Sequence, residues 1–152
     1  MRKAIVLLAL IGGGVLVWRY SASHGAEAHY KQFAEEVLKR HYDVASGMAD
    51  GLTPSALEKL GTQEHIGAGP PMFQQLFPSR FRIDSSEKEP GGGVTLHATQ
   101  TVLFNPVGVE SAVRPAMYAT MKQVVTMRKE SGGWRVTAFS NTCEKFDSTS
   151  TR

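Results

Sequence analysis

The sequence predicts an α+β fold, with an N-terminal membrane helix followed by a long helix and short helices packed on a curved antiparallel sheet of about four strands. Three observations support this prediction. An apolar run follows the first three residues, apolar side chains recur at helical spacing between residues 26 and 48, and the hydrophobic period changes to two after Pro78. A chain whose helices all precede its strands is typical of α+β proteins rather than of parallel α/β proteins.

The chain divides into three parts. Residues 1–22 read as a membrane anchor or signal segment, residues 23–143 as one α+β domain, and residues 144–152 as a polar, flexible tail. A chain of 152 residues is long enough for one hydrophobic core, and two domains would each be small.

The positive charge lies beside the membrane segment. Arg2, Lys3 and Arg19 account for the formal net charge of +3, so the remaining residues are neutral overall. Binding of phosphates requires cations clustered on one face of a domain. We therefore expect no nucleic acid among the partners.

Residues 4–18 form an uninterrupted apolar run, which is the clearest signal in the chain. The cations before it place the N-terminus in the cytoplasm. As a helix, the run spans about 22 Å of a hydrocarbon core of about 30 Å, and small residues near Ser21 suit a cleavage site. Two alternatives stay open: a single-pass bacterial inner-membrane protein with a periplasmic C-terminal domain, or export to the periplasm after cleavage of residues 1–23.

The helices are predicted from periodicity and caps. One long amphipathic helix is expected from Ala26 to Met48, because apolar residues recur there at intervals of three and four. Thr53-Pro54 reads as an N-cap followed by proline at the first helical position, which opens a short helix to Leu60. A third short helix is expected from Pro71 to Phe77.

The strands follow after Pro78. Residues 94–104 alternate between an apolar face and a face of threonines with His97. Residues 116–128 suit a helix or a strand, but the β-branched run at 124–126 favours a closing β-hairpin with residues 134–139. Cys143 is the single cysteine, so it is either an unpaired thiol or half of an intermolecular disulfide.

This arrangement, with Gly132-Gly133-Trp134-Arg135-Val136 in the closing hairpin, resembles the nuclear transport factor 2-like, or cystatin-like, superfamily over roughly residues 26–142. Behind a single membrane segment, it is similar to periplasmic domains of inner-membrane assembly factors in type IV secretion and conjugation, and to membrane-anchored accessory proteins of lipid-transport operons. Those families imply scaffolding. The superfamily also includes isomerases, dehydratases and polyketide cyclases, whose acid/base groups line a pocket between helix and sheet.

Side chains for such a pocket are present, but their spacing does not require them to converge. The residues that can carry acid/base chemistry or line an apolar pocket on the helix and the facing strand are Tyr30, Phe33, Val37, His41, Met117 and Met121, and the remaining titratable candidates are Asp43, His65 and His97. No nucleophile motif, phosphate loop or metal-ligand spacing is present. We therefore assign no catalytic residue, no metal and no cofactor.

The sequence favours a non-catalytic, membrane-anchored interaction or scaffold domain of an envelope complex, of the type IV secretion or conjugation kind. Its expected partners are other envelope or secretion-system proteins and the membrane through residues 4–18, and a homo-oligomer is left open. The alternative is a periplasmic protein whose pocket binds a small apolar ligand or acts as an isomerase or dehydratase.

Overall fold

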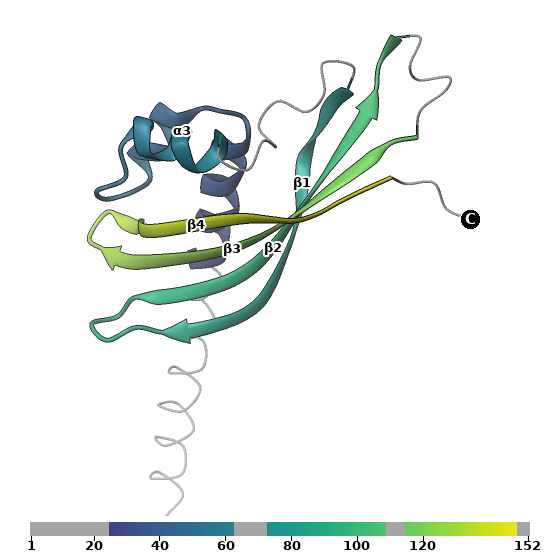
Figure 1. The fold of residues 1–152 in the computed structure, drawn as a ribbon. Helices are drawn as coiled ribbons and strands as arrows, with labels where there is room; N and C mark the ends of the chain where they lie inside the picture. The colour runs from purple at the N-terminus through teal and green to yellow at the C-terminus, as the bar shows by residue number, and fades with distance from the viewer. Residues whose placement is uncertain (1–24, 63–72, 109–114, 149–152) are drawn as a thin grey trace, which may run out of the picture.

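The structure is a computed structural model that describes residues 25–62, 73–108 and 115–148. Within these ranges, four strands form one antiparallel sheet in the order β1-β2-β3-β4, together with three short helices (Figure 1). The strands are β1 Phe73–Lys88, β2 Val94–Pro106, β3 Met117–Glu130 and β4 Gly133–Ser148. The helices cover residues 25–38, α2 Tyr42–Gly47 and α3 Pro54–Thr62. Strand β4 thus includes residues 144–148 of the predicted tail.

The prediction of one long helix is wrong, because the chain turns after residue 38. The N–H of His41 donates to the carbonyl of Glu36 at 2.9 Å, and the N–H of Arg40 donates to the carbonyl of Val37 at 3.1 Å. With a φ of 64° at Arg40, this is a Schellman motif. Glycine normally occupies the left-handed position of this motif, so an arginine there gives no sequence signal that the helix ends.

The membrane helix predicted over residues 4–18 lies outside the described residues. In the part of the chain that the structure describes, no helix has the length and apolar content needed to span a bilayer. The predicted fold class is therefore corrected: the described residues form a four-stranded antiparallel sheet with three short helices, and include neither a long helix nor a membrane helix.

The helix predicted from Pro71 to Phe77 is also wrong, because β1 begins at Phe73. Pairing with the neighbouring strand overrides the local pattern: Gln75 lies opposite Phe104 and Leu76 lies opposite Leu103. By contrast, the N-cap of α3 is confirmed, since the N–H of Ala56 donates to the Thr53 hydroxyl at 3.2 Å.

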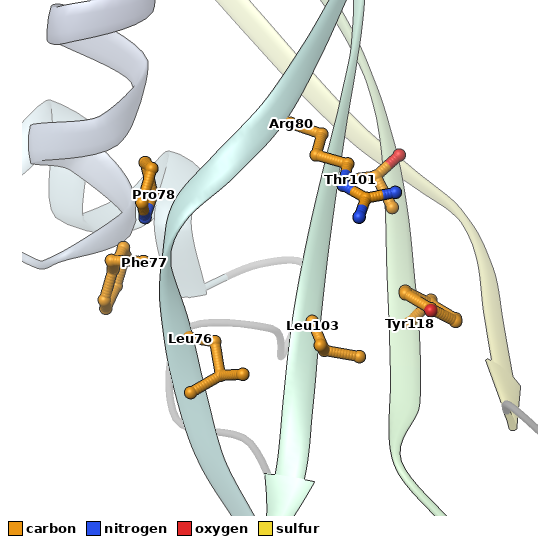
Figure 2. A pocket seen from close by; sticks show the side chains of 7 residues that line it. All are labelled: Leu76, Phe77, Pro78, Arg80, Thr101, Leu103 and Tyr118. Atoms are coloured by element: carbon orange, nitrogen blue, oxygen red, sulfur yellow. The ribbon is translucent and has the colours of Figure 1, made fainter.

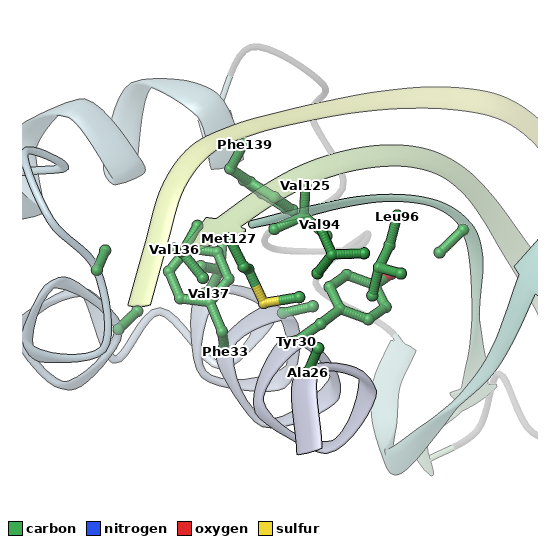
Figure 3. Close-up of a cluster of buried hydrophobic side chains, with 14 of the residues drawn as sticks. Ala26, Tyr30, Phe33, Val37, Val94, Leu96, Val125, Met127, Val136 and Phe139 are labelled. Carbon is green, nitrogen blue, oxygen red and sulfur yellow. The ribbon is translucent and has the colours of Figure 1, made fainter. Parts of the chain in front are cut away.

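The sheet is strongly twisted, with both hairpin turns at one end and the helices beside that half (Figure 1). We call the face of β2 that carries Leu96 and Phe104 the core face, and the opposite face, with Thr99 and Leu103, the outer face. On the core face, the helix over residues 25–38 packs its apolar side against the hairpin half, which forms the main cluster (Figure 3). A second cluster lies towards the other end of the sheet and comprises Leu38, Val102, Phe104, Ala119 and Met121.

Candidate functional site

A chain of buried and partly buried polar side chains crosses the core face between the two apolar clusters. It connects the helix over residues 25–38 to all four strands, and we call it the polar chain. Ser79, Gln100 and Gln123 are at most 9% exposed, so each depends on a partner within the protein. The members of the polar chain are Tyr30, Glu35, Ser79, Gln100, Gln123 and Asn141.

At one end, the polar chain fixes β1 to the helix. The N–H of Ser79 donates to Oε1 of Glu35 at 3.1 Å, and the Ser79 hydroxyl donates to Oε2 of the same carboxylate. Nε2 of Gln100 then donates to Oγ of Ser79 at 2.8 Å. The carboxylate of Glu35 therefore holds β1 where its pairing with β2 shifts register, between Leu76 and Arg80.

Gln123 is the branch point at the other end. Its Nε2 donates to Oε1 of Gln100 at 2.7 Å and to Oδ1 of Asn141 at 3.0 Å, while its Oε1 accepts the hydroxyl proton of Tyr30. Burial raises the pKa of Tyr30 well above its usual range, and the carboxylate of Asp84 raises it further. Tyr30 therefore stays protonated near neutral pH and acts as a hydrogen-bond donor.

The groups of the polar chain bond to one another, so it is suited to a structural role. A fully bonded polar network inside a core makes the fold rigid and specifies the alignment of the elements that contribute to it. Here it connects four strands and one helix through bonds between side chains and through the backbone N–H of Ser79.

The structure separates the six residues predicted to line a pocket. Tyr30 and Phe33 are fully buried in the main cluster, where the Phe33 ring packs edge-on against Phe139 at 5.1 Å between centroids (Figure 3). Val37 joins them there. The remaining three predicted residues, Met117, Met121 and His41, lie elsewhere.

Met121 belongs to the second cluster, and Met117 packs against it. His41 is at the surface, with a side chain that is 57% exposed and with Nδ1 2.7 Å from Oε2 of Glu36. The Schellman turn rotates His41 away from the apolar side of the preceding helix. The ligand pocket between helix and sheet stays a prediction, and it would have to open for a ligand to enter.

The other titratable candidates are also dispersed. Asp43 is exposed on α2, and His97 lies on the outer face with Nε2 3.5 Å from Oε1 of Glu87. His65 lies outside the described residues. Among the residues that the structure describes, no three His, Cys, Asp or Glu side chains gather in a group that could hold a metal ion.

The middle of the outer face carries a network of charges. Asp84 accepts hydrogen bonds from the Thr99 hydroxyl at 2.7 Å, from Nε of Arg82 at 2.7 Å and from Nζ of Lys122 at 3.1 Å. These three donors, Thr99 first, hold the pKa of Asp84 well below its usual range. Thr99 is only 7% exposed, although it belongs to the polar face of β2 that carries the threonines and His97.

Near the end of the sheet that is remote from the two hairpin turns, the outer face has a hollow of about 230 Å³. Leu76, Leu103 and Tyr118 lie side by side across three strands, in one row of the pairing register (Figure 2). We call this site the outer hollow; its lining is Leu76, Phe77, Pro78, Arg80, Thr101, Leu103 and Tyr118.

Charged groups of both signs lie around the outer hollow. Nζ of Lys39 pairs with Oε1 of Glu36 at 3.5 Å, and Asp147 on β4 lies opposite Tyr118 in the strand pairing. Arg80 is the charged member of the lining, and Nζ of Lys39 lies 5.4 Å from the centroid of the Phe77 ring. The nearest acidic group along β1 is Asp84, whose charge is already balanced by Arg82 and Lys122. The site therefore combines apolar side chains with polar groups and with a guanidinium group that has no ion-pair partner among the described residues.

Sequence reasoning missed both the polar chain and the outer hollow. Gln100 and Gln123 each occupy a core-face position in an otherwise apolar alternation, and a polar residue at such a position is a readable signal of a buried hydrogen bond. The outer hollow gave no such signal, because Leu76 and Tyr118 become neighbours of Leu103 only through strand register.

Comparison of the chain with protein-family models, with curated proteins and with solved structures found no match.

Proposed function

We propose that this chain is a non-catalytic interaction protein of the bacterial envelope. Residues 4–18 hold it at the inner membrane or direct it across, and the folded domain binds other envelope or secretion-system proteins in the periplasm. The apolar run with its preceding cations supports this location. The sequence resemblance to periplasmic domains of type IV secretion and conjugation assembly factors supports the same class.

The observation that carries the proposal is the outer hollow. Its volume of about 230 Å³ is below the about 300–1,000 Å³ usual for small-molecule sites. Partly exposed apolar side chains beside an arginine are instead typical of the anchor points of protein interfaces. Because the polar chain fixes the strands that form the hollow, its shape is established before a partner binds.

The competing function, a small-ligand or isomerase-like pocket protein, places its site between helix and sheet. There Tyr30, Phe33 and Val37 are at most 6% exposed and pack directly on the strands. A ligand could enter only if the helix moved and broke the bonds from Tyr30 and Glu35 to the sheet. The outer hollow needs no such movement.

The test is the native mass of the tagged full-length protein, extracted from its own membranes in a mild detergent, with its co-purifying proteins identified. We expect an assembly that contains several envelope proteins. A monomer or homodimer without other proteins would contradict the proposal. The proposal would also be contradicted if the purified protein turned over a defined substrate and if His41→Ala abolished that turnover without unfolding the protein.

A further inference from the structure

Within the proposed interaction function, on which this inference rests, we propose that the outer hollow binds an acidic and apolar peptide segment of a partner protein. A bulky apolar side chain of that segment fills the hollow, and a neighbouring carboxylate pairs with Arg80.

The apolar part of the lining is suited to binding an apolar side chain. Leu76, Leu103 and Tyr118 form its floor across three neighbouring strands, and Phe77, which is 41% exposed, lies at its margin and projects to the other side of β1 (Figure 2). An apolar side chain placed here would remove these carbon surfaces from water. A hollow of about 230 Å³ holds one or two side chains, as expected for an interface anchor.

Charge selects the neighbouring group. Arg82 and Arg128 each lie within 2.9 Å of a carboxylate oxygen, and Arg135 donates to the carbonyls of Gly47 and Ala49. Among the described residues, Arg80 has no carboxylate within ion-pair distance. A guanidinium group binds a carboxylate through two parallel hydrogen bonds, so a partner with an acidic residue beside its anchor complements this site.

The position of the hollow at a sheet edge favours an extended peptide segment as its occupant. In the described sheet, β1 pairs only with β2, so the side of the hollow formed by Leu76 and Phe77 lies at a sheet edge. Pro78 interrupts the backbone donors of β1 there, which limits how far a new strand could extend along that edge. Recognition therefore depends on side chains in the hollow more than on added sheet hydrogen bonds.

The experiment selects from a random peptide library displayed on phage against the full-length protein in lipid nanodiscs. We expect enrichment of peptides with Leu, Phe, Met or Trp next to Asp or Glu. Arg80→Gln is expected to weaken the best peptide by about fivefold to tenfold. Lys88→Gln, which removes one positive charge at the other, exposed end of β1, should change binding by less than about twofold. Leu103→Ala should weaken it as well, whereas Val124→Ala on the same face should not.

Several results would overturn the inference. These are enrichment without acidic residues, no enrichment at all, or peptides that bind the Arg80→Gln variant as tightly as the unmodified chain. A homodimer that Arg80→Gln dissociates would also overturn it, because the occupant would then be a second copy. If the native-mass experiment still finds an envelope assembly, only the docking site falls; if the chain purifies alone, the proposed function falls too.

Discussion

Gln123 forms hydrogen bonds with three other polar side chains, those of Tyr30, Gln100 and Asn141. Gln123→Leu keeps a similar volume but removes the bonds that Gln123 makes to the buried Tyr30 and Gln100 and to the partly buried Asn141. An unsatisfied buried polar group costs about 1–3 kcal/mol, so we expect the free energy of unfolding to fall by at least about 2 kcal/mol. Urea denaturation measures this, and Val124→Ala, on the opposite face of β3, should change it by less than about 0.5 kcal/mol.

The same contact can be tested by coupling. Tyr30→Phe should cost less in the Gln123→Leu background than in the unmodified chain, because its bond to Gln123 is already lost. Interaction energies between contacting groups are typically about 0.5–3 kcal/mol. If the two substitutions act additively, Tyr30 and Gln123 are not bonded as the structure describes.

The raised pKa of Tyr30 predicts a loss of stability at alkaline pH. The unfolded chain releases the phenol proton near the ordinary pKa of 10.0, while the folded chain holds it to higher pH. The contribution of Tyr30 is therefore fully present below about pH 10 and declines as the pH rises above that value. Urea midpoints between pH 8 and 11 should fall more steeply for the unmodified chain than for Tyr30→Phe; parallel curves would contradict the assignment.

Among the elements, the break between residue 38 and α2 depends on Arg40 in a left-handed conformation, with a φ of 64°. Such a conformation costs an L-residue about 1 kcal/mol relative to glycine. Arg40→Gly should therefore leave stability unchanged or raise it by up to about 1 kcal/mol. Gln32→Gly, within the preceding helix, should lower stability by about 1 kcal/mol. Thermal unfolding separates the two, and equal losses would show that the helix does not end at Arg40.

The two hairpin turns contain glycines with different surroundings. A Cβ at Gly93 would lie 2.8 Å from the backbone oxygen of Met127, whereas one at Gly132 would meet nothing within 4 Å. Gly93→Ala should therefore lower the free energy of unfolding by about 1–3 kcal/mol through overpacking. Gly132→Ala should be neutral or stabilising by up to about 1 kcal/mol. If both variants melt alike, the packing of the first hairpin against β3 is wrong.

The contrast between Thr53 and Arg40 shows what local sequence can predict. Thr53-Pro54 combines a side-chain cap with a proline of suitable φ, so the start of α3 depends on adjacent residues and can be predicted from the sequence. The end of the helix over residues 25–38 depends on backbone hydrogen bonds around a residue without turn preference. Similarly, Gln75 and Leu76 belong to a strand because they pair with Phe104 and Leu103 of β2, and their own neighbours in the sequence do not predict that pairing.

At the scale of the whole molecule, the two faces of the sheet have different roles: one forms the core, and the other carries the proposed binding site. The core face holds the apolar clusters and the polar chain, which together align the helix with the strands. The outer face carries the charge network around Asp84 and the outer hollow. The N-terminal segment and the neutral domain predict an interaction protein from the sequence, and the proposed docking site becomes visible only when the strands are paired.

Photo-crosslinking in living cells tests whether the outer hollow binds another envelope protein. Tyr118, which lines the outer hollow, is replaced by the photoreactive p-benzoylphenylalanine, and Val124, exposed at the other end of the same face, is replaced in a matched strain. We expect a specific crosslink from position 118 to another envelope protein, at a segment with an acidic residue beside an apolar one, and little crosslinking from position 124. The absence of a crosslink at 118, in cells where the native assembly still forms, would contradict it.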